Sequence, residues 1–199
     1  MDYAKTYYND NLKNKGEQAV AVMSLGGAKS VSENEKVQEL VAAGIAIAVA
    51  AGNEDDDSCT YSPASAVLQG AGTEAANFGP MNVGSVRYDQ TKSSFSNWGS
   101  CITLFAPGSA IKSAGHTGDS EYKTLSGTSM AAPFVTGALA LVREASKTLT
   151  AKQAQNWVKT AAISGRVHAL DMVRLYGITT HHAIDSAWNC ILEKSQLPN

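Results

Sequence analysis

Apolar and amphipathic segments alternate over the first fifty residues of the chain. Residues 19–25 (AVAVMSL) are apolar enough to form a sheet strand. Residues 32–44 (SENEKVQELVAAG) combine a capping box with one apolar face and end in a glycine, which is the pattern of a helix. Residues 45–51 (IAIAVAA) are uninterrupted apolar sequence, typical of a strand buried on both faces. This order predicts a right-handed βαβ unit and therefore an α/β fold with a parallel sheet.

Capping residues mark the starts of two predicted helices. Ser32 with Glu35 forms the capping box of the first helix, and Thr150 with Gln153 forms that of a helix ending near residue 162. Between them, a third helix is predicted from about residue 129 to 146. The inward faces of the first and third helices are predicted to hold Val37, Leu40 and Val41, and Val135, Leu139 and Val142.

Shorter segments complete the pattern. Residues 1–13 have a helical pattern that asparagines weaken. Residues 52–82 are rich in Gly, Ser, Asp and Pro, which predicts a long surface loop, and residues 113–123 are typical of a surface hairpin that carries His116. Short strands are predicted at MNVGSV, CITLF and AIKSA, which are residues 81–86, 101–105 and 110–114.

Composition and charge exclude several classes of partner. The chain has 199 residues, 44% of them hydrophobic, which is enough for one well-cored domain. A net charge of −2 lacks the basic excess of a nucleic-acid-binding protein. The most apolar stretch, residues 40–52, has 13 residues and is too short to span a bilayer. We therefore expect a single domain with neither nucleic acid nor membrane as a partner.

The three cysteines leave two interpretations open at the level of composition. Cys59, Cys101 and Cys190 are compatible with three free buried thiols or with one disulfide and a thiol left over. They do not form a CxxC pair, so no zinc site is predicted.

The segment GTSMAAP (residues 127–133) carries the strongest chemical signal. Ser129 stands at the predicted start of a helix, where the first backbone N–H groups have no partner within the helix. Those groups and the positive end of the helix dipole stabilise an oxyanion that forms beside the serine. An isolated serine at this place is most often a plain N-cap, but the whole heptapeptide favours a nucleophile.

A second signal is VAAGNE (residues 49–54). Asn53 follows a predicted parallel strand, so its side-chain amide lies at the carboxyl end of the sheet, where open α/β folds bind ligands. Such an asparagine is either an ordinary turn residue or a donor to an oxyanion.

Four motifs in order resemble the subtilases, and within them the proteinase K and aqualysin branch. They are MSLGG (23–27), VAAGNE (49–54), SSFSNWGSCITLFAPGSAIKSA (93–114) and GTSMAAP (127–133). The resemblance covers about residues 1–175 and leaves 176–199 as an unassigned tail. It implies a subtilisin-like doubly wound parallel sheet, with residues 1–199 as a single catalytic domain that lacks its N-terminal part.

The resemblance also implies roles in a serine endopeptidase that cleaves polypeptides. Ser129 would be the nucleophile and Asn53 the side-chain oxyanion donor. The substrate would lie against two segments, one as an added strand, and their small residues predict a broad apolar preference at P1. These substrate-binding residues are Ser24, Leu25, Gly26, Ala50, Ala51 and Gly52.

The catalytic Asp and His of a subtilase would lie before MSLGG, where this sequence has 22 residues and no histidine. His116 falls in the predicted hairpin, and the other histidines fall beyond the serine helix, at 168, 181 and 182. We expect the chain to be the C-terminal part of a longer peptidase and to be inactive alone. The missing part would also supply central strands, which leaves the strand at 19–25 with an uncovered edge.

The family pattern bears on disulfides, metals and location. Cys59 and Cys101 fall where aqualysin-like members have a disulfide, which implies an oxidising, secreted or vacuolar setting, although this chain has no export signal. At Thr103 the proteinase K pattern would place an Asp that helps to bind structural calcium, so no cofactor or metal is predicted here. The acidic run 54–57 is either a solvated loop or a site for a cation or for basic residues on the leaving side of the substrate.

Two functions of different classes remain. The first is a fragment of an active subtilase. The second is a non-catalytic pseudoprotease or peptide-binding protein that keeps the groove at residues 24–26. Retention of both Ser129 and Asn53 favours the first, because a binding protein needs neither. A nucleotide-binding α/β domain is a third and disfavoured alternative, since no GxGxxG or P-loop motif is present.

Overall fold

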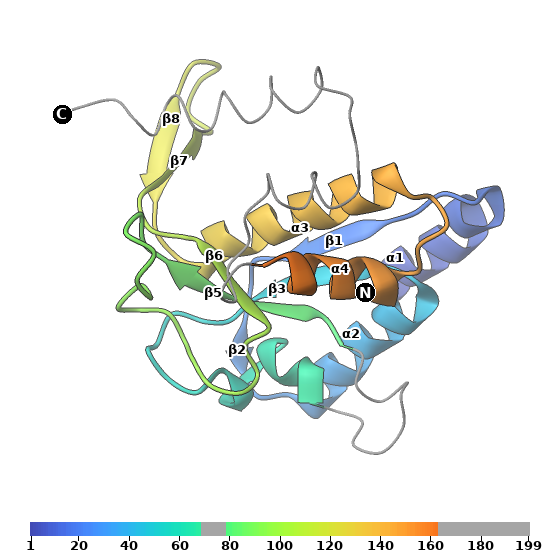
Figure 1. Cartoon of the computed structure of the whole chain (residues 1–199), viewed down its shortest axis with the longest axis horizontal. Coiled ribbons are helices and arrows are strands. Elements are labelled where there is room, and N and C mark those ends of the chain that lie inside the picture. Colours follow the sequence, from blue (N-terminus) through green and yellow to red (C-terminus); the bar gives the residue numbers. More distant parts are fainter. Residues whose placement is uncertain (69–78, 163–199) are drawn as a thin grey trace.

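A four-stranded parallel sheet forms the centre of the computed structural model, which describes residues 1–68 and 79–162 (Figure 1). Its strand order is β1-β3-β5-β6. The strands are β1 (Val20–Met23), β3 (Ala46–Ala50), β5 (Met81–Val86) and β6 (Leu104–Pro107). The parallel βαβ unit predicted from the apolar pattern is therefore confirmed.

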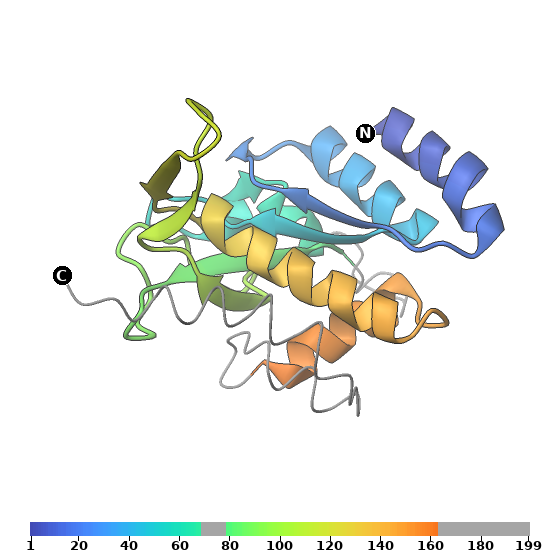
Figure 2. The same ribbon diagram turned by 90° about the horizontal axis from the view of Figure 1, so that it is seen from above.

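Helices cover both faces of this sheet (Figure 2). Along β3, Ala46 and Ala48 belong to one apolar cluster, and Ile47 and Val49 belong to the other, because successive side chains of a strand point to opposite faces. The first cluster includes α3 (Thr128–Ala145) and α4 (Ala151–Ala161), and the second includes α2 (Val31–Ala43) and the N-terminal helical segment that begins with α1 (Asp2–Tyr7). The predicted doubly wound arrangement is thus confirmed.

The helical N-terminal segment extends beyond α1. One π-helical stretch, Tyr8–Leu12, and one 3₁₀ turn, Lys13–Lys15, continue it. The Tyr8 side chain is buried against α2, so the segment is held by packing despite its asparagines. The predicted helix over residues 1–13 is confirmed in position.

The predicted start of α2 is wrong by two residues. Its N-cap is Ser30, whose hydroxyl accepts a hydrogen bond from the Glu33 N–H at 3.3 Å. The Ser30 N–H donates to the Ser62 hydroxyl at 2.8 Å, and this hydroxyl donates back to the Ser30 carbonyl at 3.2 Å. This tertiary pairing holds Ser30 in extended conformation next to the helix, which the local pattern did not reveal. Gly44 ends the helix in the left-handed conformation, as predicted.

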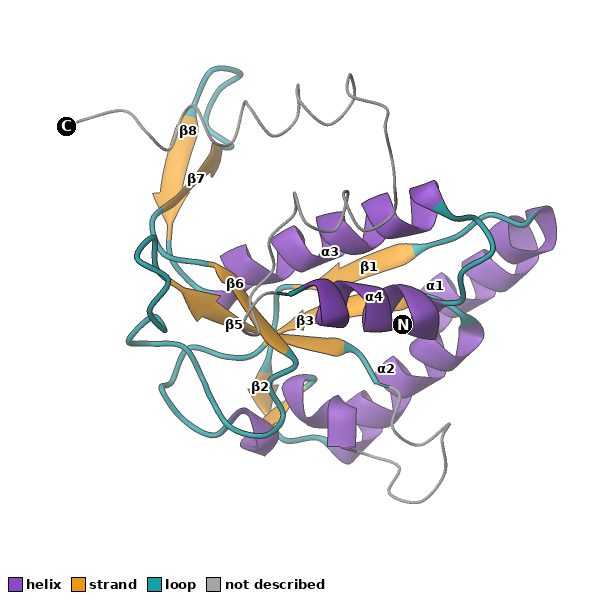
Figure 3. Ribbon diagram, viewed as in Figure 1, coloured by secondary structure: helices purple, strands orange, loops and turns teal. Residues whose placement is uncertain are grey.

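The segment predicted as a long surface loop at 52–82 is partly buried. Within it, β4 (Tyr61–Ser62) pairs antiparallel with β2 (Gly27–Ala28), and residues 64–66 are buried. The surface hairpin around His116 is confirmed as β7 (Ile111–Ala114) and β8 (Tyr122–Leu125), which project from the rest of the molecule (Figure 3).

Strand β1 lies at one end of the described sheet, and Val22 at its centre is 44% exposed. This agrees with the uncovered edge predicted for residues 19–25. In residues 1–68 and 79–162, no helix is both long and apolar enough to cross a membrane. The predictions for His168, His181, His182, Cys190 and the tail 176–199 concern positions outside the described residues.

The capping box at the start of α4 is expected to contribute measurably to the free energy of unfolding. The Thr150 hydroxyl accepts from the Gln153 N–H at 3.2 Å, and the Gln153 side chain accepts from the Thr150 N–H at 2.9 Å. Thr150→Ala is expected to lower the free energy of unfolding by about 1 kcal/mol in urea denaturation, because an N-terminal N–H loses its acceptor. Thr148→Ala, outside the box, is the control, and equal losses in both variants would contradict the assignment.

Candidate active site

Ser129 lies in the first turn of α3, beside the residue that follows β1. Its hydroxyl donates to the Ser24 carbonyl at 3.3 Å, and the Ser24 hydroxyl donates to the Ser129 carbonyl at 2.9 Å. In a regular helix the Ser129 carbonyl would accept from residue 133, but Pro133 has no N–H. The Ser24 hydroxyl supplies this missing donor and ties the start of α3 to the end of β1.

Asn53 is oriented by Thr128, the residue before Ser129. The Asn53 Oδ1 accepts from the Thr128 N–H at 2.8 Å and from its hydroxyl at 3.1 Å. The Thr128 Oγ1 in turn accepts from the Gly52 N–H at 3.1 Å, and Thr128 is fully buried. Since the amide oxygen is engaged with α3, the Asn53 NH₂ group is the end left to act as a donor. Sequence reasoning missed this role of Thr128, whose signal lies within GTS.

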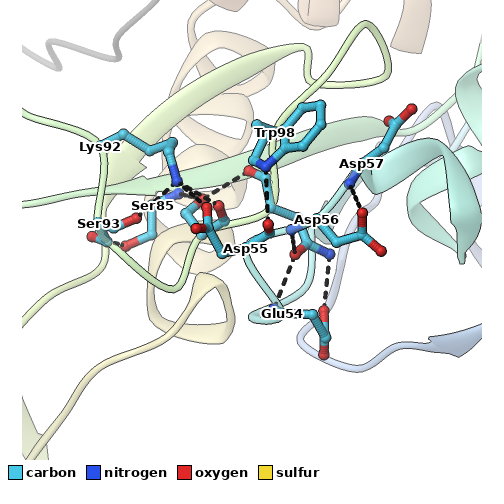
Figure 4. A network of polar contacts seen from close by, with 10 residues as sticks. Glu54, Asp55, Asp56, Asp57, Ser85, Lys92, Ser93 and Trp98 are labelled. Carbon is cyan, nitrogen blue, oxygen red and sulfur yellow. Dashed lines mark hydrogen bonds and ion pairs between the residues drawn. The ribbon is translucent and has the colours of Figure 1, made fainter.

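Asn97 lies between β5 and β6, and its fully buried side chain bonds the loop that follows β3. Its Oδ1 accepts from the N–H groups of Glu54 and Asp56 at 2.9 and 3.0 Å. Its Nδ2 donates to the Ala51 carbonyl at 3.0 Å and to the Glu54 carboxylate at 2.9 Å (Figure 4). All four hydrogen-bonding positions of the amide are therefore used to shape residues 51–56. Sequence reasoning missed Asn97, although it lies in the motif SSFSNWGS.

Gly52 is required by this close packing. Its φ of +104° is a left-handed conformation that favours glycine. A Cβ at this position would overlap the Asn97 Nδ2 and lie 2.6 Å from the Glu54 Oε2. The residue before Asn53 therefore admits no side chain.

A cavity of about 220 Å³ opens beside Ser129. Five of the six predicted substrate-binding residues line it, whereas Ser24 is engaged with Ser129 instead. Glu54 and Tyr61 also line the cavity, and neither was predicted there. The full lining is Leu25, Gly26, Gly27, Ala50, Ala51, Gly52, Asn53, Glu54, Tyr61, Ser62, Thr128 and Ser129.

One disulfide and one ion pair fasten the loop that follows β3. Cys59 and Cys101 form a disulfide with a Cα–Cα distance of 5.4 Å, which confirms the pairing implied by the resemblance. The Lys92 ammonium bonds the Asp55 carboxylate at 2.7 Å (Figure 4). Closure of a 42-residue separation stabilises a fold by roughly 4 kcal/mol through the entropy of the unfolded chain.

The residues at Thr103 do not fit a calcium ion. The Thr103 hydroxyl accepts from the Asn82 N–H at 3.0 Å, and the Thr103 N–H donates to the Asn82 carbonyl at 2.9 Å. A neutral hydroxyl already bound to an amide does not provide the charged oxygen ligand that calcium favours. In the described part of the chain, no group of three or more His, Cys, Asp or Glu side chains is arranged to hold a metal.

The described residues do not provide Ser129 with a histidine. His116 is exposed on the β7–β8 hairpin, and the other three histidines lie outside the described residues. The hydrogen-bond partner of the Ser129 hydroxyl among residues 1–68 and 79–162 is the Ser24 carbonyl.

Comparison with known proteins identifies the family. The model of the subtilase family matches residues 2–183, so the chain belongs to that family. It is 43% identical over 154 residues to the alkaline serine exoprotease A of Vibrio alginolyticus, covering 77% of this chain and 26% of that protein. It is 40% identical over 141 residues to the extracellular serine proteinase of a Thermus species, covering 71% of this chain and 32% of that protein.

A solved structure gives the same result for the fold. The crystal structure of a cold-adapted subtilisin-like serine proteinase has a TM-score of 0.67 and 38% identity, and the match covers 80% of this chain and 53% of that one. The fold is thus subtilisin-like. The chain spans about half of that structure and between a quarter and a third of the two curated relatives.

Proposed function

We propose that this chain is the part of a subtilisin-type serine endopeptidase that carries the nucleophile, the oxyanion donors and the P1 pocket. One observation carries the proposal: Thr128 holds the Asn53 side chain next to Ser129 through bonds of 2.8 and 3.1 Å. A binding protein needs no amide donor aligned with a serine at a helix start.

In the proposed reaction the Ser129 Oγ attacks the scissile carbonyl carbon of a bound peptide. Its proton passes to a histidine from a segment outside this chain, and that histidine then protonates the leaving amine as the C–N bond breaks. The oxyanion is bound by the Asn53 Nδ2 and by backbone N–H groups at the start of α3. Water then attacks the acyl group on Ser129. The same histidine takes a proton from this water and gives it to the Ser129 Oγ as the ester bond breaks.

Substrate binding follows from the same geometry. A peptide would add as an extended strand along residues 24–26, and its P1 side chain would enter the cavity lined by Leu25 and Ala50–Gly52. The Ser24 hydroxyl, tied to the Ser129 carbonyl, fixes the distance between this strand and the nucleophile.

We also propose that the protein works outside the reducing cytoplasm. The Cys59–Cys101 disulfide supports this, since such bonds persist in oxidising compartments. The Thermus relative is named as an extracellular enzyme, which points the same way.

The deciding experiment uses the protein isolated from its source, referred to below as the native protein. Its intact mass and N-terminal sequence would be measured, and it would be treated with a biotinylated fluorophosphonate. The proposal predicts an upstream segment that carries Asp and His, and a single labelled peptide that contains Ser129.

Ser129→Ala is the control and is expected to lose the label. A native protein that begins at Met1, or one that carries the upstream segment yet leaves Ser129 unlabelled, would contradict the peptidase and favour a peptide-binding protein.

A further inference from the structure

A chain of buried serines ends close to the start of α3, and the proposed reaction uses none of them. Ser85, near the end of β5, and Ser93 and Ser96, in the segment between β5 and β6, are buried. The Ser85 and Ser93 hydroxyls share a hydrogen bond of 2.8 Å (Figure 4). The Ser93 hydroxyl shares a second one, of 2.7 Å, with the Ser109 hydroxyl.

The backbone of Ser85 is held by the same segment. Its N–H donates to the Ser96 hydroxyl at 2.9 Å, and its carbonyl accepts from the Ser93 N–H at 2.9 Å. The N–H, the carbonyl and the hydroxyl of Ser85 are thus each bonded to residues 93–96. Its side chain therefore has one fixed place in the fold.

Gly108 connects this buried network to α3. It directly follows β6, and its N–H donates to the Val86 carbonyl at the end of β5 at 3.0 Å. Its carbonyl accepts from the Gly127 N–H at 2.8 Å. Gly127 is the N-cap residue of α3 and lies two residues before Ser129.

Close contact, and not backbone conformation, requires glycine at position 108. The backbone there is not left-handed, so alanine could adopt it. A Cβ at this position would overlap the Ser85 Oγ, and it would lie 2.7 Å from the Gly127 carbonyl oxygen. Gly127 also lies beside the Asn53 amide, which a Cβ at residue 127 would approach to 3.7 Å. A shift of Gly127 would therefore move the start of α3 relative to Asn53.

From these contacts we propose that Gly108 and Ser85 are positioning residues for the nucleophile. The Ser85 hydroxyl closes the space beside Gly108, and the Gly108 carbonyl holds Gly127, which sets where Ser129 stands relative to Asn53. Neither Gly108 nor Ser85 lines the cavity beside Ser129, so the effect falls on the chemical step and not on binding of the P1 side chain. The inference rests on the proposed peptidase function.

The first test overfills the contact. Gly108→Ala is expected to lower kcat of the native protein roughly 10- to 100-fold, because a misplacement of about 1 Å can cost roughly 100-fold. KM should stay within about two-fold, since the cavity lining is untouched. Hydrolysis of a peptide anilide gives both constants, and kcat is expressed per Ser129 that reacts to completion with a fluorophosphonate, so that unfolded molecules are not counted. The control is Gly137→Ala in α3, where a Cβ meets nothing within 4 Å and kcat should be unchanged.

The second test removes the support without any overlap, and it decides the question if Gly108→Ala does not fold. Ser85→Ala leaves a small gap beside Gly108 and is expected to lower kcat per labelled site roughly 2- to 5-fold, with KM unchanged. The control is Ser65→Ala, which also removes a buried hydroxyl, but one that accepts from the Asn34 side chain of α2 at 2.9 Å. This variant should keep full kcat.

The outcomes separate positioning from a purely structural role and from the function beneath it. An unchanged kcat per labelled site overturns the role of Ser85 in Ser85→Ala, and that of Gly108 in a folded Gly108→Ala, even where less protein is labelled. A rise in KM as large as the fall in kcat also overturns the inference. A wild-type native protein that neither hydrolyses the anilide nor becomes labelled at Ser129 rejects the proposed function itself.

Discussion

Replacing Asn53 by alanine is expected to lower kcat of the native protein roughly 100- to 1,000-fold, the range that loss of one oxyanion donor costs in a subtilisin. KM should change little, because the oxyanion forms only after the substrate is bound. The structural reason is the orientation of Asn53. The Thr128 N–H holds its oxygen at 2.8 Å, so in the proposed reaction the NH₂ group would be the end that donates to the developing charge.

The measurement is steady-state hydrolysis of a peptide anilide by the native protein and its Asn53→Ala variant. Asn14→Ala, at an exposed position in the N-terminal helical segment, is the matched control and should keep full kcat. Asn53→Asp should be as damaging as alanine, since a carboxylate accepts from Thr128 but has no N–H to donate. If kcat fell less than five-fold in both Asn53 variants, the side chain would not be an oxyanion donor.

Local pattern and motif together predicted the framework of the site correctly. Successive side chains of the apolar strand at residues 45–51 point to opposite faces of the sheet, some toward α2 and others toward α3. Because both faces of this strand are apolar, it must lie inside the sheet with helices on both sides. Because parallel strands share one carboxyl edge, the ends of β1 and β3 had to bring residues 24–26 and Asn53 to the same place. The start of α3 was readable from the helix pattern, so Ser129 was placed as well.

The features of the site that could not be predicted from the sequence depend on contacts between segments far apart in the chain. Ser30 rather than Ser32 caps α2 because its backbone pairs with Ser62, 32 residues away. The role of Asn97 depends on a loop 41 to 46 residues before it. Glu54 enters the cavity because Asn97 and the Asn53 N–H bind its carboxylate. None of these pairings has a periodicity, so one sequence read locally contains no sign of them.

Replacing Asn97 by leucine is expected to lower the free energy of unfolding by about 3 to 5 kcal/mol. Leucine fills a similar volume but leaves the N–H groups of Glu54 and Asp56 and the Ala51 carbonyl without partners in a buried place. Each such loss costs about 1 to 3 kcal/mol, less where water enters. Urea denaturation of the 199-residue chain measures the effect, with the exposed Asn14→Leu as control.

The same variant tests whether the loop is one cooperative unit. If Asn97 positions both Glu54 and Asn53, Asn97→Leu should also reduce kcat of the native protein, at temperatures where the variant is still folded. A loss of less than about 1 kcal/mol, or a stability loss with kcat intact, would contradict this coupling.

Asn97→Asp is expected to destabilise the fold by an amount that depends on pH. The N–H groups of Glu54 and Asp56 favour the charged form of the new carboxylate at one oxygen. Its other oxygen would face the Glu54 carboxylate and the Ala51 carbonyl in a buried place, and two carboxylates in contact cannot both stay charged, so we expect the folded-state pKa to lie above its unfolded value of about 3.9. A group whose pKa is raised by folding stabilises the folded state most when it is protonated. The loss of unfolding free energy relative to the wild type should therefore grow as pH rises through the unfolded-state pKa, and it should become constant above the folded-state pKa. A deficit that does not change with pH would mean that residue 97 does not face Glu54.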